Sequence, residues 1–127
     1  MVRKAIRGEY VTASGPYSHA IDSEQYVFLS GQTAMNSQSI KENLKGNIAE
    51  QTKECFKNLS EVLKAANLTF DDVVKVNVYL TDMKHFNEMN EVYKTMFNGP
   101  YPARTCIAVL ALPLGAEVEI EMIAKRS

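Results

Sequence analysis

The chain has 127 residues, of which 46 % are hydrophobic and 23 % are charged, and its formal net charge is −1. These values predict one globular domain over residues 1–127 with a modest core. A near-neutral chain lacks the basic field that binding to nucleic acid or to an anionic membrane requires. No apolar run is long enough to span a bilayer.

The first ten residues contain no apolar segment of the kind that a signal peptide carries. The two cysteines, Cys55 and Cys106, lie far apart in the sequence. Without a secretory context, we expect free thiols rather than a disulfide. These observations together predict a cytoplasmic protein.

Three short strands are expected first, over residues 2–12, 17–21 and 26–30. The first segment is short and mixed in character, which indicates an edge strand. The polar residues 22–25 have the length of a hairpin turn between the second and third strands. The third strand is apolar, so it should be buried, and we expect it to end at Ser30-Gly31.

A polar loop over residues 36–46 should precede the first helix. Asn47 and Glu50 have the spacing of an N-cap and its reciprocal partner, and Asn67 is a helix stop signal. The apolar residues between these signals recur with helical spacing: Ile48, Cys55, Phe56, Leu59, Val62, Leu63 and Ala66. Cys55 belongs to this face, which favours a structural role over a reactive one.

Residues 73–80 alternate as a strand with one buried face, with Val74, Val76, Val78 and Leu80 on the core side. Thr81-Asp82 then opens a second helix, which Asn98-Gly99-Pro100 ends. Its apolar stripe consists of Phe86, Met89, Val92, Tyr93, Met96 and Phe97.

With two more strands near the C-terminus, the element order is β-β-β-α-β-α-β-β. This order is typical of an α+β fold, in which two helices cover one face of a mixed sheet. The other face would then be covered by water or by another subunit.

The stretch from Tyr101 to Ala124 contains two strand-like runs around a Leu-Pro-Leu-Gly turn, which indicates a hairpin or a near relative. Alternation places Arg104 and Cys106 on one face of the first run. It places Glu117, Glu119 and Glu121 on one face of the second. We therefore expect a row of carboxylates on the sheet face that has no helices, close to an arginine on the neighbouring strand.

Alternation alone favours a solvated face with a surface ion pair, since most such pairs contribute little. The alternative is a carboxylate-binding arginine beside a general base, and the spacing does not decide between the two.

The motif Pro-Ala-Arg-Thr-Cys, followed by Leu-Pro and Val-Glu-Ile-Glu-Met-Ile-Ala, is similar to the C-terminal signature of the reactive-intermediate deaminase family (RidA, also called YjgF). Gly-Pro-Tyr at residues 15–17 and Ser-Gly-Gln at residues 30–32 also resemble this family. The resemblance covers essentially the whole chain. Residues 36–46 depart from many members, which carry a Pro/Gly-containing turn there, so the local loop shape is expected to differ. The resemblance implies a chorismate-mutase-like fold and a homotrimer with sites between subunits.

The resemblance also implies an activity, the hydrolysis of 2-iminobutanoate and 2-iminopropanoate to 2-keto acids and ammonia, without a cofactor. Arg104 would bind the substrate carboxylate, and Glu119 would deprotonate the attacking water. The motif match selects Glu119, because alternation cannot choose among the three glutamates. The other positions implied to bind substrate are Cys106, Ser30 and Gly31 at the imine end, Tyr17 from a facing subunit, and Asn90 on the second helix.

Two other functions remain open. A non-catalytic trimer that binds small carboxylates as a regulator would need Arg104 but not Glu119. A ribonuclease or translation inhibitor, a role also attributed to this family, is disfavoured because the chain has no basic aromatic patch.

No metal site is predicted, because His19 and His85 have no partner at ligand spacing. A nucleophilic pair of Cys106 with either histidine would require the fold to bring them together.

Overall fold

The structure is a computed structural model, and it describes residues 3–40 and 44–127. Its two α-helices are α1 (Ile48–Ala65) and α2 (Phe86–Tyr93). Its strands are β1 (Lys4–Ile6), β2 (Ala20–Ser23), β3 (Tyr26–Thr33), β4 (Val73–Leu80), β5 (Ala103–Ala108) and β6 (Val118–Lys125). Among these residues, no helix is long and apolar enough to cross a membrane.

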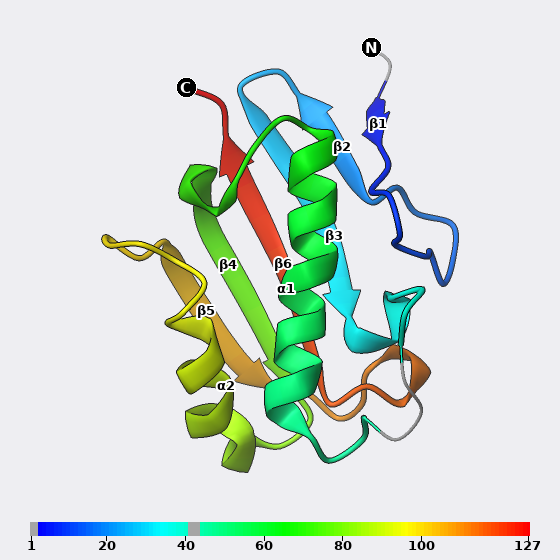
Figure 1. Cartoon of the computed structure of the whole chain (residues 1–127), viewed down its shortest axis with the longest axis vertical. Helices are drawn as coiled ribbons and strands as arrows, with labels where there is room; N and C mark the ends of the chain where they lie inside the picture. The colour runs from blue at the N-terminus through cyan, green and yellow to red at the C-terminus, as the bar shows by residue number, and fades with distance from the viewer. Residues whose placement is uncertain (1–2, 41–43) are drawn as a thin grey trace.

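The strands form one mixed sheet in the order β1-β2-β3-β6-β4-β5. Every pair is antiparallel except β4 and β5, which run parallel because α2 carries the chain back between them. Both helices lie on the same face of the sheet (Figure 1). The expected α+β architecture and element order are therefore confirmed, and we call the uncovered side the open face.

The expected hairpin between β5 and β6 is wrong, because β4 lies between these two strands. Residues 109–117 carry the chain past the end of β4 rather than through a tight turn. Val109 N donates to Leu80 O at 2.8 Å, and Thr81 N donates to Glu117 O at 3.1 Å. A connection of this length has room to cross a strand, whereas a tight hairpin has two to five loop residues.

The three N-terminal strands form, but their bounds differ from the prediction: β1 covers Lys4–Ile6 within the expected 2–12, and β2 (Ala20–Ser23) includes two residues expected in the turn. β1 is an edge strand, and β2 and β3 form a hairpin in which Ser23 pairs with Tyr26. β3 does not end at Ser30-Gly31, however, but continues to Thr33 through a bulge between Leu29 and Gln32. A bulge bends the strand and turns side chains away from the regular alternation.

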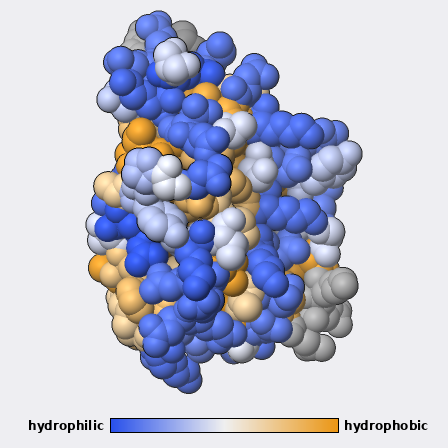
Figure 2. All heavy atoms as spheres, turned by 60° about the vertical axis from the view of Figure 1, so that its left-hand side comes forward, coloured by the Kyte–Doolittle hydropathy of each residue, from blue (hydrophilic) through white to orange (hydrophobic). Residues whose placement is uncertain are grey.

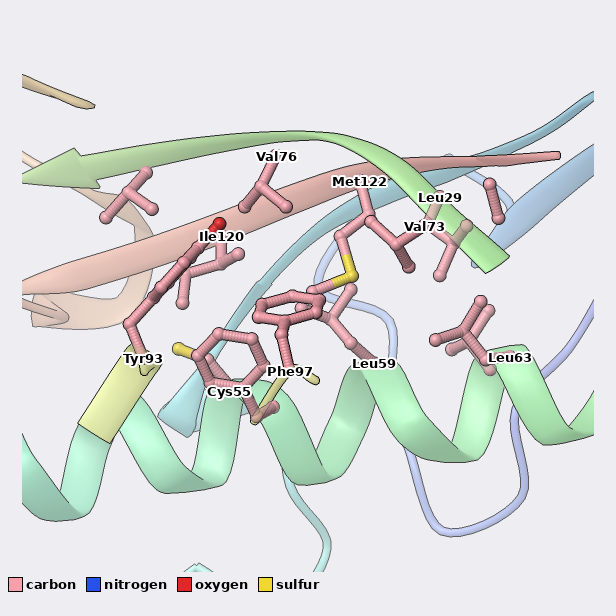
Figure 3. Close-up of a cluster of buried hydrophobic side chains, with 14 of the residues drawn as sticks. Leu29, Cys55, Leu59, Leu63, Val73, Val76, Tyr93, Phe97, Ile120 and Met122 are labelled. Carbon is pink, nitrogen blue, oxygen red and sulfur yellow. The ribbon is translucent and has the colours of Figure 1, made fainter. Parts of the chain in front are cut away.

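The first helix begins and ends where its signals predict. The Asn47 side chain accepts from Glu50 N at 3.1 Å, and Asn67 has the left-handed φ of 61° that ends a helix. The buried face of α1 packs on the sheet, with Leu59 and Leu63 below Met122 and Val73 (Figure 3). Phe56 makes edge-to-face contacts with Phe70, Tyr93 and Phe97, with ring centroids 5.7–5.9 Å apart.

Cys55 lies in this core, as predicted, and burial raises the pKa of its thiol. A protonated thiol sealed in the core behaves as a small apolar side chain.

One residue of β4 departs from the expected alternation. Val74 is 42 % exposed, whereas Val73 is 7 % exposed and packs in the core. The pairing with β6 shifts between Val73 and Lys75, and this irregularity reverses the faces at the start of the strand. Val76, Val78 and Leu80 are buried as predicted.

Candidate active site

The first of two hollows relevant to the predicted site lies where β3 and β6 run side by side. It has a volume of about 290 Å³ and is lined by Ser14, Tyr17, Ser30, Gly31, Asn36, Pro113, Glu119 and Glu121. We call it the glutamate hollow. It brings together four of the predicted site residues, namely Tyr17, Ser30, Gly31 and Glu119.

Glu119 is the half-buried carboxylate of this hollow. Its Cα partners are Thr33 on β3 and Tyr79 on β4. A Cβ added to Gly31 would lie 2.7 Å from Glu119 Oε2, so only glycine leaves room for the carboxylate in this position. Burial, followed by the neighbouring charge of Glu121, raises the pKa of Glu119. Such a carboxyl group exchanges protons closer to neutral pH than an exposed one does.

Tyr17 is held at the rim of the hollow by a polar network that the sequence did not reveal. Asn36 Nδ2 donates to Tyr17 Oη at 3.0 Å, and Ser14 N donates to it at 3.3 Å. Asn36 is itself buried and is fixed by Gln32 and Thr33. Because both acceptor positions of the phenol are used, its hydrogen is left for Ser14 Oγ, at 3.4 Å, or for a ligand.

The Ser30 side chain points back to the protein. Its Oγ donates to Ser18 O at 2.6 Å, which ties the bulge of β3 to the segment that carries Tyr17. Its amide N also donates, to His19 O at 2.9 Å, so contact of Ser30 with a ligand would come from its backbone carbonyl.

The second hollow lies beside α2 and β5 and has a volume of about 370 Å³. We call it the arginine hollow, and its lining is Asn90, Glu91, Tyr93, Lys94, Tyr101, Pro102 and Arg104. On this side of the molecule, hydrophobic residues are exposed between hydrophilic ones (Figure 2).

Arg104 is fixed by α2. Its Nη1 donates to Asn90 Oδ1 at 2.7 Å, and its guanidinium carbon lies 4.6 Å from the centre of the Tyr93 ring and 5.6 Å from that of Phe86. A guanidinium that stacks on rings and keeps unused N–H groups is suited to binding a planar carboxylate. Asn90 was predicted as a site residue, whereas Tyr93 was predicted only as part of the apolar stripe.

Cys106 lies on the same face of β5 as Arg104, as alternation predicts, and packs against the core. Burial raises the pKa of its thiol, although the charge of Arg104 opposes this effect. The raised pKa disfavours the thiolate that a nucleophilic cysteine needs.

Arg104 and the glutamates do not share a face of the sheet, and this prediction is wrong. Arg104 pairs with Val76, whose side chain is in the core, so it lies on the helix-covered side. Glu121 pairs with Asn77 and Glu119 with Tyr79, on the open face. With β4 between β5 and β6, the two strands are roughly 10 Å apart. One small molecule therefore cannot contact Arg104 and Glu119 of the same chain.

Glu117 also departs from the predicted row of carboxylates. It precedes β6, and its side chain accepts hydrogen bonds from Gly46 N and from Gln51 Nε2. It also lies 3.5 Å from His85 Nε2. Glu117 thus joins the start of α1 to the turn before α2.

Neither histidine accompanies Cys106. His85 lies beside Glu117, and His19 Nδ1 accepts from Gly8 N at 2.9 Å. Within residues 3–40 and 44–127, no cluster of three histidine, cysteine or acidic residues is arranged to hold a metal ion.

Comparison with known proteins identifies the family. The family described as Endoribonuclease L-PSP matches residues 8–126. The chain belongs to this family. A mouse member named 2-iminobutanoate/2-iminopropanoate deaminase is 43 % identical over 125 residues, which are 98 % of this chain and 92 % of the mouse protein.

Solved structures of Endoribonuclease L-PSP relatives share the fold. RidA from an Antarctic Psychrobacter bacterium is 36 % identical, with a TM-score of 0.89 over 98 % of this chain and 100 % of its own. Escherichia coli TdcF, solved with bound serine, is 34 % identical, with a TM-score of 0.89 over 98 % of this chain and 99 % of its own. The resemblance noted in the sequence is thereby confirmed.

Proposed function

We propose that this protein is a cofactor-independent hydrolase that converts reactive 2-imino acids, such as 2-iminobutanoate and 2-iminopropanoate, to 2-keto acids and ammonia. The mouse relative carries this activity in its name and matches the chain over nearly its whole length. The observation that carries the proposal is the half-buried Glu119, whose raised pKa suits proton transfer, in a hollow beside Tyr17.

The glutamate hollow and the arginine hollow are proposed to be halves of one site that two subunits complete. In a homotrimer, the arginine hollow of one subunit would meet the glutamate hollow of the next. Symmetry would then build identical sites between the chains. The separation of Arg104 from Glu119 within one chain supports this arrangement, because only a second subunit could bring both to one substrate.

In the proposed complex, Arg104 binds the substrate carboxylate through two parallel N–H groups, while Asn90 and Tyr93 hold the guanidinium in place. Backbone groups at Cys106 and at Ser30-Gly31 bind the imine end, and Tyr17 closes the pocket. The serine bound in the structural relative TdcF is also a small molecule with an α-carboxylate, which agrees with a carboxylate-binding site in this fold.

The reaction then needs one base and one water. The Glu119 carboxylate takes a proton from water as the water oxygen adds to the C=N carbon, and it passes this proton to the imine nitrogen to give a neutral carbinolamine. Glu119 then takes the carbinolamine hydroxyl proton and passes it to the amino nitrogen as the C=O bond forms and the C–N bond breaks, so that ammonia departs and a 2-keto acid remains. Because an imine is already electrophilic, positioning and one base account for the chemistry.

The other functions considered from the sequence are less well supported. A ribonuclease would need a basic surface for the RNA backbone, and the chain has a net charge of −1. A regulator that only binds carboxylates would have no use for a half-buried Glu119. We further infer a cytoplasmic location. A fission-yeast relative that is 41 % identical is named mitochondrial. Microscopy of the tagged chain in cells distinguishes the two compartments.

The proposed activity is tested by generating 2-iminobutanoate enzymatically and measuring the release of ammonia and 2-ketobutyrate. The protein should increase the rate of release well above that of spontaneous hydrolysis. No increase, together with calorimetric binding of 2-ketobutyrate, would instead identify a carboxylate-binding protein without deaminase activity.

A further inference from the structure

Two carboxylates share the glutamate hollow. Glu119 and Glu121 are two residues apart on β6, so their side chains leave the strand on the same face, and both line the hollow. None of the ion pairs between described residues involves either of them. Two like charges thus lie together without a cation from the described part of the same chain.

Glu121 is held in place by donors from β4. The Tyr79 hydroxyl donates to Glu121 Oε1, and Asn77 Nδ2 donates to the same oxygen at 3.1 Å. Tyr79 is also the Cα partner of Glu119, so the residue that holds one carboxylate lies next to the other. The hydrogen bond to Glu121 and burial raise the pKa of Tyr79 to about 12, so the phenol remains a donor at neutral pH.

We propose that Glu121, fixed by Tyr79 and Asn77, is a positioning residue whose negative charge keeps Glu119 basic enough to take a proton from water. This inference deepens the proposed deaminase function and rests on it. The titratable groups that face Glu119 are Glu121 from β6, Tyr79 from β4 and Tyr17 from the segment before β2. Cys55 of α1 lies behind it, on the other side of the sheet. Glu121 is the carboxylate among these neighbours of Glu119, whereas the others are two phenols and a thiol.

The direction of the effect follows from electrostatics. A neighbouring negative charge disfavours the ionised form of Glu119, so it adds to the effect of burial and raises the pKa of Glu119 further. Removing the charge of Glu121 should lower that pKa and leave the burial effect in place. The limb of the pH profile in which Glu119 becomes deprotonated should then move to lower pH.

The test variant is Glu121→Gln, which keeps an oxygen that can accept from Tyr79 and Asn77 but removes the charge. The matched control is Glu9→Gln, which removes the same charge from an exposed position that does not line the glutamate hollow. Two quantities are measured for each folded variant. One is the titration of the Glu119 carboxyl carbon by NMR, with its resonance assigned by its absence in Glu119→Gln. The other is kcat/KM for 2-iminobutanoate as a function of pH.

We expect Glu121→Gln to lower the Glu119 midpoint and the acid limb of kcat/KM by about one pH unit, whereas Glu9→Gln changes neither. On the plateau of the pH profile, kcat/KM should fall several-fold because Glu119 is a weaker base in this variant. An unchanged Glu119 midpoint in Glu121→Gln would overturn the proposal. A shifted midpoint with an unshifted acid limb would also overturn it.

The NMR titration needs no substrate, so it separates this inference from the proposed function. If the unaltered protein released no ammonia, the deaminase function would fail, and the catalytic role of Glu121 would fail with it. The measured midpoints would then still establish whether the two carboxylates are coupled.

Discussion

At the scale of single residues, Glu119 differs from the other glutamates of its strand region by its surroundings. Glu117 is bound by Gly46 and Gln51, and Glu121 is bound by Tyr79 and Asn77. For Glu119, the close neighbour is the backbone of Gly31, where a side chain would not fit. A half-buried carboxylate that forms no ion pair with residues 3–40 or 44–127 is available to exchange protons with water.

We therefore predict that Glu119→Gln retains binding of 2-ketobutyrate but loses about a hundredfold or more in turnover, because the amide has nearly the same shape and cannot act as a base. In the unaltered protein, activity should fall as the pH decreases through the raised pKa of Glu119. Calorimetry and ammonia release measure binding and turnover separately. Full turnover by Glu119→Gln would exclude Glu119 as the base.

Cys106 leads to a different expectation. Because burial keeps its thiol protonated, Cys106→Ser should retain measurable deaminase activity. Mass spectrometry of the unaltered protein during turnover should find no covalent adduct. A trapped thioether or thiohemiaminal at Cys106, or complete inactivity of the folded serine variant, would reverse the assignment.

At the scale of elements, the bulge in β3 places Gly31 against Glu119. We predict that Gly31→Ala folds but loses turnover on the order of a hundredfold, because the new methyl group displaces the carboxylate and a shift of about 1 Å is enough for such a loss. The atoms that must move are the end of a flexible side chain, so the free energy of unfolding should change by less than about 1 kcal/mol.

The control for this variant is Gly15→Ala, where the nearest atom to a new Cβ is 3.8 Å away. Urea unfolding and ammonia release are measured for both. Equal turnover by Gly31→Ala and Gly15→Ala would show that the fit of Gly31 against Glu119 has no role in catalysis.

The elements themselves were largely predictable from the sequence, since their signals are local. Asn47 and Asn67 delimit α1 correctly, and alternation correctly groups Arg104 with Cys106 and Glu119 with Glu121. The pairing of β4 between β5 and β6 was not predictable, because it depends on contacts between distant residues. Without knowledge of that pairing, the sequence could not show that Arg104 and Glu119 lie on opposite faces of the sheet.

Residues that act through tertiary contacts were missed for the same reason. Asn36 lies in the segment for which the sequence predicts a polar loop, and its buried side-chain amide donates to Tyr17 Oη. Alternation in residues 73–80 places Tyr79 on the side away from the core, but it does not show that Tyr79 donates to Glu121. The roles of Asn36 and Tyr79 follow from the fold.

At the scale of the whole molecule, the helices cover one face of the sheet and leave the other open (Figure 1). Large apolar side chains remain at the surface on the strands, including Phe28, Val74 and Ile107. A trimer that buries this open face would explain these side chains and would bring an arginine hollow to a glutamate hollow. We propose that each site takes Arg104 from one subunit and Glu119 from another.

Mixing of two inactive variants within one trimer tests this shared site. Arg104→Ala lacks the carboxylate anchor and Glu119→Gln lacks the base, so each should have little deaminase activity alone. The two variants, carrying different tags, are co-expressed, and assemblies that contain both are purified. In a cyclic trimer that contains both variants, about a third of the sites between chains, one site in each trimer, contain both native residues. We predict that the mixed assemblies recover about that share of the native activity, whereas a blend of the separately assembled variants stays inactive. Mixed assemblies no more active than the two variants alone would contradict a site shared between subunits.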